Sequence, residues 1–206
     1  NSIIEKNLSH ETYICSKDDI DKNPEKYQYL EKIPHHIISY DDYIYQKKGK
    51  TVHKVKADTQ TTCYFAKPDG KIGIVPTILK SLLDQRKQTR AKAKKTPDEN
   101  KKKVLDGLQL AYKVTANSVY GQMGAKTSSI FFKKIAACTT SIGRERIYDA
   151  ASGVKEWAEE NDYKPPEVVY GDTDSVFVKF SRLKDGKFLS GKEALAHCIK
   201  CGQEAG

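Results

Sequence analysis

Residues 168–178 read Val-Val-Tyr-Gly-Asp-Thr-Asp-Ser-Val-Phe-Val. Two short runs of β-branched and aromatic residues flank a polar centre, which is typical of a β-hairpin. Asp172 and Asp174 therefore lie at or beside its tip, where two like charges are costly unless a cation neutralises them. Mg²⁺, held by carboxylates and phosphate oxygens, is the natural cation for such a place. The stretch predicts a phosphoryl-transfer site.

The same stretch has a simpler interpretation as a polar turn, because Asp is common in turns. A calcium loop of the EF-hand type is disfavoured, since the third ligand, the central Gly and the distant Glu of that loop are absent. The rest of the chain has to decide between a metal site and a turn.

Composition indicates a polyanionic partner. The chain of 206 residues has 36 Lys and Arg against 27 Asp and Glu, a formal net charge of +9, which favours nucleic acid or an anionic membrane surface. No stretch approaches the roughly 18 apolar residues of a membrane span. Five scattered cysteines indicate free thiols in a reducing compartment. Because the chain starts without Met and stops inside an apparent helix, we expect an internal fragment.

A helical hairpin is predicted in the middle of the chain. Apolar residues repeat with helical periodicity from Pro76, which suits a first helical position, to about Lys95. Thr96-Pro97-Asp98-Glu99 predicts a capping box with Thr96 as the N-cap. One face of the second helix carries Val104, Leu108, Ala111 and Thr115. The short turn makes the two helices antiparallel neighbours.

The hairpin also carries polar residues at helical spacing. Arg86 and Arg90 stand at i and i+4, and Lys113, Asn117 and Tyr120 at i, i+4 and i+7. Antiparallel helices could bring both sets into one slot, where Arg forks and a Lys point charge suit a triphosphate. The polar stripe of any surface helix explains them as well. The basic tip between the helices is either solvated or a contact to nucleic-acid backbone, through Lys92, Lys94 and Lys95.

Two further regions complete the expected organisation. Short β-branched pieces between residues 37 and 66 predict a small antiparallel β region. Residues 134–161 predict a helix that buries Ile135, Cys138, Ile142, Val154 and Trp157.

Several motifs resemble those of one family. Residues 113–121, Lys-Val-Thr-Ala-Asn-Ser-Val-Tyr-Gly, resemble the Kx3NSxYG motif of family B DNA polymerases, and residues 170–175, Tyr-Gly-Asp-Thr-Asp-Ser, resemble their YGDTDS palm motif. Residues 73–79 are similar to the start of the family's first fingers helix, and residues 2–4 to the tail of its SLYPSII motif. The Asn-Ser-Ile-Ile start is most similar to polymerases of large double-stranded DNA viruses of algae and protists.

The resemblance implies an α+β fold. A partial polymerase palm, an antiparallel β hairpin with packing helices, would be joined to a two-helix antiparallel fingers hairpin. Residues 1–72 would be the N-terminal part of the palm, 73–124 the fingers and 125–206 the palm with the YGDTDS hairpin. The exonuclease and thumb would lie outside this fragment.

The resemblance also implies residue roles. Asp174 would ligate metal with Asp172 close by, and two Mg²⁺ ions, or Mn²⁺, would hold the triphosphate and activate the primer 3′-hydroxyl. Arg86, Arg90 and Lys113 would grip the triphosphate, and Asn117 would lie near its phosphates or sugar. Tyr120 and Gly121 would face the nascent base pair, and Thr173 would lie near the primer terminus.

The implied function is template-directed DNA synthesis from dNTPs on primer-template DNA. A sliding clamp is an implied partner, a membrane is not, and the implied location is intracellular, in the nucleus or a cytoplasmic viral factory. The family's other metal-binding Asp precedes Asn1, so residues 1–206 alone are expected to be inactive. A non-catalytic polymerase-like DNA-binding domain is the alternative, and RNA-templated synthesis is a third reading that the acidic hairpin leaves open.

Overall fold

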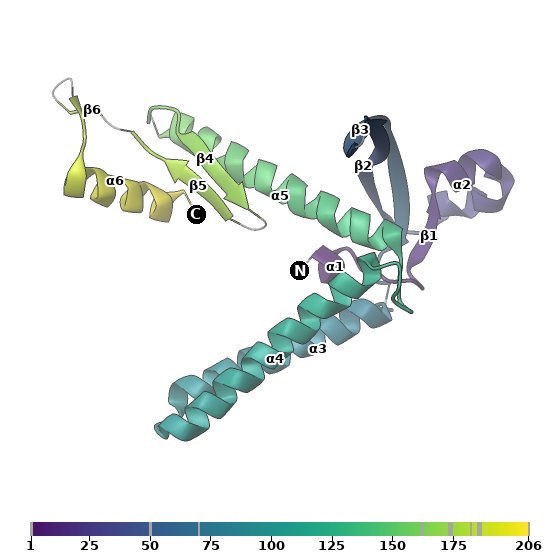
Figure 1. The fold of residues 1–206 in the computed structure, drawn as a ribbon, viewed down its shortest axis with the longest axis horizontal. Coiled ribbons are helices and arrows are strands. Elements are labelled where there is room, and N and C mark those ends of the chain that lie inside the picture. Colours follow the sequence, from purple (N-terminus) through teal and green to yellow (C-terminus); the bar gives the residue numbers. More distant parts are fainter. Residues whose placement is uncertain are drawn as a thin grey trace. The chain divides into compact units, whose positions relative to one another are not determined.

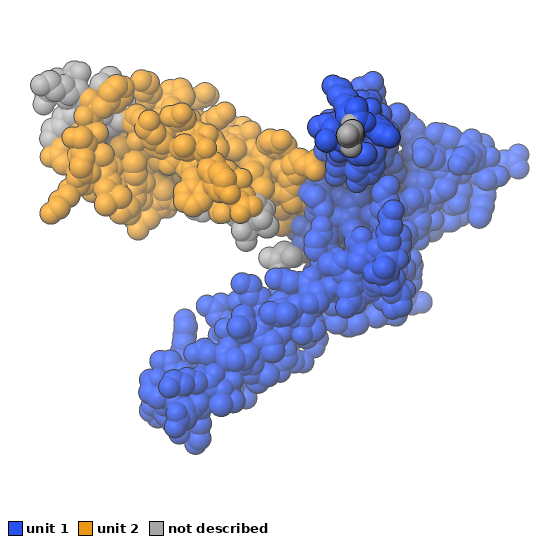
Figure 2. Space-filling model, viewed as in Figure 1, with its two compact units in different colours: residues 1–141 blue, residues 142–206 orange. Residues whose placement is uncertain are grey.

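The computed structural model describes residues 2–49, 51–69, 71–161, 163–172, 175–181, 183–184 and 187–205. The chain forms two compact units, residues 1–141 and 142–206 (Figure 2). The described elements mix helices with antiparallel sheets, which confirms the α+β class. The division into palm and fingers stays a prediction.

A three-stranded sheet lies in the first unit, with strand order β1-β3-β2 and antiparallel pairing throughout. After α1 (Ser2–Glu5) come β1 (Tyr13–Ser16), α2 (Lys17–Lys22) and the 3₁₀ helix η1 (Pro24–Lys32). The strands β2 (His35–Lys48) and β3 (Thr51–Ala66) then run side by side as one long ribbon (Figure 1). The expectation of short separate pieces was wrong here, because the pairing continues past an irregularity between Asp41 and Tyr43.

The core of the first unit gathers where this sheet meets the helices. Phe65, Leu8, Met123 and Ile135 are completely buried, and burying such side chains supplies the main driving force for folding. Asn7 ties the N-terminal segment to two other elements. Its Nδ2 donates to the carbonyl of Ala66 at 3.1 Å, and its Oδ1 accepts from the Gly73 amide at 2.8 Å.

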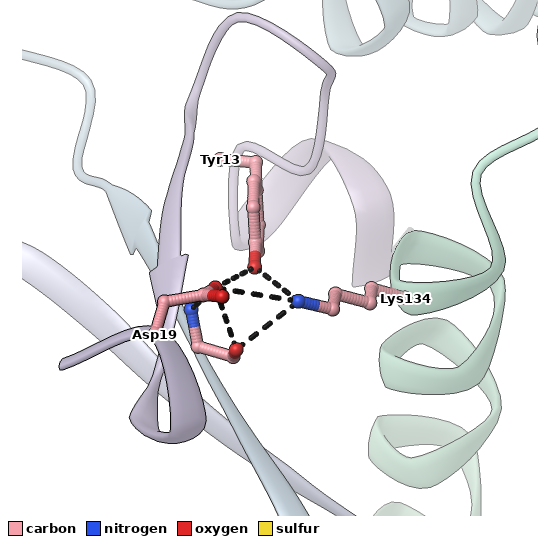
Figure 3. A network of polar contacts seen from close by, with 4 residues as sticks. Tyr13, Asp19 and Lys134 are labelled. Atoms are coloured by element: carbon pink, nitrogen blue, oxygen red, sulfur yellow. Dashed lines mark hydrogen bonds and ion pairs between the residues drawn. The ribbon is translucent and has the colours of Figure 1, made fainter. Parts of the chain in front are cut away.

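A polar network fixes the start of helix α5 (Lys133–Glu160) to the sheet (Figure 3). The Lys134 ammonium donates to Tyr13 Oη at 2.7 Å and Ser16 Oγ at 3.1 Å, and lies 3.5 Å from Asp19 Oδ2. Asp19 also accepts from the backbone amide and the hydroxyl of Ser16. These bonds from Ser16, together with the Lys134 charge, lower the pKa of Asp19 from its usual 3.8 to about 2.

The predicted helical hairpin is present as α3 (Ile74–Lys95) and α4 (Glu99–Gly124), which lie antiparallel (Figure 1). The predicted caps were wrong. Gly73 is the N-cap of α3, so Pro76 is its third residue. Asp98 and not Thr96 caps α4, because its carboxylate accepts from the amides of Asn100 and Lys101, satisfying two of the free donors at the helix start.

The helix α5 (Lys133–Glu160) agrees with its predicted bounds, and Ile135, Cys138 and Ile142 are buried as expected. The second unit continues with the hairpin β4 (Glu167–Asp172) and β5 (Ser175–Lys179), the short pair β6 (Leu183–Lys184) and β7 (Lys187–Phe188), and α6 (Gly191–Glu204). All five cysteines are free thiols. Within the described part of the chain, no helix combines the length and the apolar character needed to cross a bilayer.

Candidate functional site

The helices α3 and α4 pack along a line of contact that we call the seam. The position of each predicted nucleotide-binding residue relative to the seam decides on which side of the hairpin its side chain lies. The least exposed positions of α4 alternate in steps of three and four, and they are Lys102, Leu105, Gln109, Tyr112, Ala116, Val119 and Met123. This spacing is typical of two helices packed along a narrow stripe. The predicted face was wrong as a packing face, because Val104 is 72 % and Leu108 42 % exposed. Those residues precede the seam by one position and lie on its flank.

Arg86 lies at the seam itself and is half-buried. Its Nε donates to Oε1 of Gln109 on α4 at 3.3 Å. A shallow hollow of about 360 Å³ opens beside it, lined by Leu83, Arg86, Lys87, Arg90, Ala91 and Lys94. The structure therefore brings Arg86, Arg90 and Lys94 to one concave, strongly basic surface. Sequence reasoning missed Gln109 and Lys87, although helical spacing from Lys113 and Arg90 would have indicated both.

The polar residues of α4 lie on the same flank as this hollow. Lys113, Asn117 and Tyr120 each follow a seam residue of α4 by one position. On α3, Arg90 likewise follows Thr89, which is buried. Both helices are right-handed, and they run in opposite directions. Residues one position after a seam residue therefore lie on the same side of the helix pair in both helices. Lys113, Asn117 and Tyr120 are exposed. This flank therefore carries cationic side chains, an amide and an aromatic ring.

Two features mark the end of α4 nearest the core. The Tyr120 hydroxyl lies 2.7 Å from Oγ1 of Thr140 on α5, which fixes the ring. A side chain at Gly121 would meet nothing within 4 Å among the described atoms of the chain. The glycine is therefore not needed for packing within the described structure.

Lys92 and Lys95 lie in the exposed last turn of α3 with Lys94. Lys92 precedes the seam residue Ala93 and Lys94 follows it, so their side chains leave the helix on different sides. Lys94 alone of the three lines the hollow.

The acidic hairpin belongs to the second unit. The strands β4 and β5 pair from Glu167 with Lys179 to Asp172 with Ser175. Asp172 is exposed at the end of β4, and its carbonyl accepts from the Ser175 hydroxyl at 3.2 Å. Gly171 lies against α5, because a Cβ there would be 3.5 Å from Cγ2 of Ile147. Thr173 and Asp174 lie outside the described residues.

The donor chemistry at this place fits a hard divalent ion. Asp172 offers carboxylate oxygens at an exposed strand end, which Mg²⁺ accepts together with water and phosphate. One strand end gives only part of a ligand set, and the described residues contain no group of three or more His, Cys, Asp or Glu that could hold a metal.

Comparison with known proteins decides the family. The sequence profile described as DNA polymerase family B matches residues 1–201. This chain belongs to DNA polymerase family B. The two most informative motifs of the sequence, at residues 113–121 and 170–175, both lie within the matched region.

Relatives of this family B chain include viral and cellular polymerases. The DNA polymerase of Phaeocystis pouchetii virus is 36 % identical over 231 residues and covers all of the chain, which spans 22 % of that relative. The DNA polymerase of Pyramimonas orientalis virus is 34 % identical over 99 % of the chain, and the chain spans 19 % of that relative. The DNA polymerase delta catalytic subunit of Schizosaccharomyces pombe is 44 % identical over 69 % of the chain, and the chain spans 12 % of that relative. The chain thus spans about a fifth of the length of these two viral relatives.

Proposed function

We propose that this chain supplies the nucleotide-binding helices and one metal-binding hairpin of a template-directed DNA polymerase. The observation that carries the proposal is the basic flank of the α3–α4 hairpin in a chain that belongs to family B. The reaction is attack of a primer 3′-hydroxyl on the α-phosphorus of a dNTP, with pyrophosphate leaving. Primer-template DNA and dNTP are the proposed substrates, and a sliding clamp is a proposed partner.

The basic flank would hold the triphosphate. Arg86 keeps its Nε on Gln109, which leaves the two terminal guanidinium nitrogens to grip phosphate as a fork. Lys113 and Arg90 add charge on the same flank and neutralise the negative charge that develops on the leaving group. Asn117 would bind near the phosphates or sugar. Tyr120, held by Thr140, would face the nascent base pair.

The hairpin would hold metal through Asp174 and Asp172, whose oxygens suit Mg²⁺, with Mn²⁺ as a substitute. The two bound ions would lower the barrier by stabilising the attacking and leaving oxygens of the displacement. Thr173 would lie near the primer terminus. An intracellular site of action, in the nucleus or a cytoplasmic viral factory, follows from the proposed role and the viral relatives.

Asp174→Ala in the complete protein that carries this sequence tests the proposal. We expect primer extension with Mg²⁺ to fall to background while DNA binding, measured by fluorescence anisotropy, is retained. Glu167→Gln is the matched control, because it removes a carboxylate at the opposite end of the same hairpin, 3.4 Å from Lys179, and should preserve synthesis. Unchanged function in Asp174→Ala would favour a non-catalytic, DNA-binding role.

A further inference from the structure

The outer half of the β2–β3 ribbon is a second surface with chemistry of its own. Beyond the irregularity at Asp41, six residue pairs run from Tyr43–Lys56 to Lys48–Thr51. All of the described residues in this half are exposed on both strands. The sequence from Tyr43 to Lys56 contains five lysines and no Asp or Glu. An isolated two-stranded ribbon buries little apolar surface of its own. Packing therefore does not explain why this ribbon is rich in lysine and lacks acidic residues.

The two faces of this ribbon differ. Directly paired residues share a face and alternate residues along a strand change face. One face carries Tyr43, Tyr45 and Lys47 opposite Lys56, Lys54 and Val52. The other face carries Ile44, Gln46 and Lys48 opposite Val55, His53 and Thr51. Both tyrosine rings are therefore on the first face, interleaved with lysines, and we call this surface the Tyr–Lys face.

Two lysines of the Tyr–Lys face have contacts within the chain, whereas one tyrosine ring on this face is largely exposed. The Lys54 ammonium lies 4.2 Å from the centroid of the Tyr43 ring, and Lys56 Nζ is 2.9 Å from Asp41 Oδ2. Tyr45, in contrast, is 73 % exposed. An aromatic ring that is this exposed, beside lysines, is available to stack on a ligand.

We propose that the Tyr–Lys face binds single-stranded nucleic acid. Proteins bind single strands by stacking bases on aromatic rings and pairing phosphates with cations along the same groove or strand. Tyr45 would stack on a base, and Lys47 and Lys54 would contact the flanking phosphates. The proposal does not depend on the catalytic role, because this surface is separate in sequence from the α3–α4 flank and the acidic hairpin.

The test is fluorescence anisotropy of a labelled oligo(dT) strand with the complete protein, in the absence of dNTP and metal. Tyr45→Ala should weaken binding about fivefold or more, as loss of one stacked base does. Lys47→Gln should weaken binding and reduce the slope of log K against log salt by about 0.7, the value for one phosphate contact on a single strand. The matched controls are Ile44→Ala and Lys48→Gln, neighbours on the opposite face, which should bind within twofold of the unaltered protein.

Three results would overturn the proposal. Equal losses for Lys47→Gln and Lys48→Gln would show a diffuse charge effect without a preferred face. Unchanged binding in both Tyr45→Ala and Lys47→Gln would show that the ribbon does not contact the strand. A larger loss on a duplex of the same length than on oligo(dT) would assign the face to another form of DNA. Primer extension by the same variants distinguishes these outcomes from a failure of the proposed polymerase activity.

Discussion

In the proposed site, Gly121 would serve a ligand at the expense of the stability of its own helix. Glycine inside a helix is destabilising relative to alanine, by about 0.5–1 kcal/mol. Gly121 lies within α4, and a Cβ there would meet nothing within 4 Å in the described chain. Packing within the described chain therefore gives no reason for glycine, whereas the proposed close approach of a nascent base pair would.

We expect Gly121→Ala to raise the free energy of unfolding by about 0.5–1 kcal/mol while lowering kcat/KM for dNTP incorporation by about tenfold or more, because the added methyl displaces the reacting groups. Gly107→Ala is the control, since Gly107 is also in α4 and its Cβ would also meet open space. It should stabilise equally and leave activity unchanged. Urea denaturation and single-nucleotide incorporation measure the two effects. Full activity in Gly121→Ala would remove Gly121 from the proposed site.

The helix α2 and the first turn of α5 depend on one carboxylate. Ser16 donates twice to Asp19, and Lys134 and Tyr13 contact it as well, so the folded-state pKa of Asp19 is about 2. A depressed pKa contributes stability above the unfolded-state value, and that stability is lost as the pH falls from about 5 to about 2. The carboxylate is 38 % exposed, so solvent screening reduces the contribution to about 1 kcal/mol.

Asp19→Asn should therefore lower the free energy of unfolding by about 1 kcal/mol at pH 7 and flatten its pH dependence between about pH 5 and 2. Asp18→Asn removes the same charge from an exposed neighbour in the same turn and should change neither quantity appreciably. Urea denaturation at several pH values measures both. Parallel pH curves for the unaltered protein and Asp19→Asn would show that the network contributes nothing.

At the scale of the elements, the sequence predicted the helices but not their caps or the contacts between distant segments. Helices α3, α4 and α5 follow from local apolar periodicity, which is a property of each segment alone. The cap of α4 was misassigned, because Thr96 and Asp98 both suit an N-cap and only the last turn of α3, where Thr96 donates to the Lys92 carbonyl at 2.8 Å, decides between them. The Lys134–Tyr13 contact joins residues 121 positions apart, and no local pattern can indicate such a pair.

In the candidate site, as in the fold, local spacing was predictable from the sequence and contacts between separate elements were not. Spacing alone placed Arg90, Lys113, Asn117 and Tyr120 on defined helix faces. It could not place Arg86 at the seam on Gln109, because the register of two packed helices depends on both partners. Val104 and Leu108 illustrate the same limit, since an apolar stripe beside the true seam looks equally suited to packing.

At the scale of the whole molecule, the proposed function draws on residues of both compact units. Lys113 belongs to residues 1–141 and Asp172 to residues 142–206. If both act on the same triphosphate and its metal ions, their contributions to the transition state are coupled. If the units serve separate sites, they are independent.

A double-mutant cycle on kcat/KM for dNTP distinguishes these arrangements. We expect Lys113→Ala and Asp172→Asn together to cost less than the sum of the single effects, with a coupling energy of about 0.5–3 kcal/mol. The control cycle pairs Lys113→Ala with Glu167→Gln, at the far end of the same hairpin, and should be additive. Additivity in the first cycle as well would mean that the basic flank and the acidic hairpin do not meet on one substrate, which would contradict the single-site mechanism while leaving the family assignment intact.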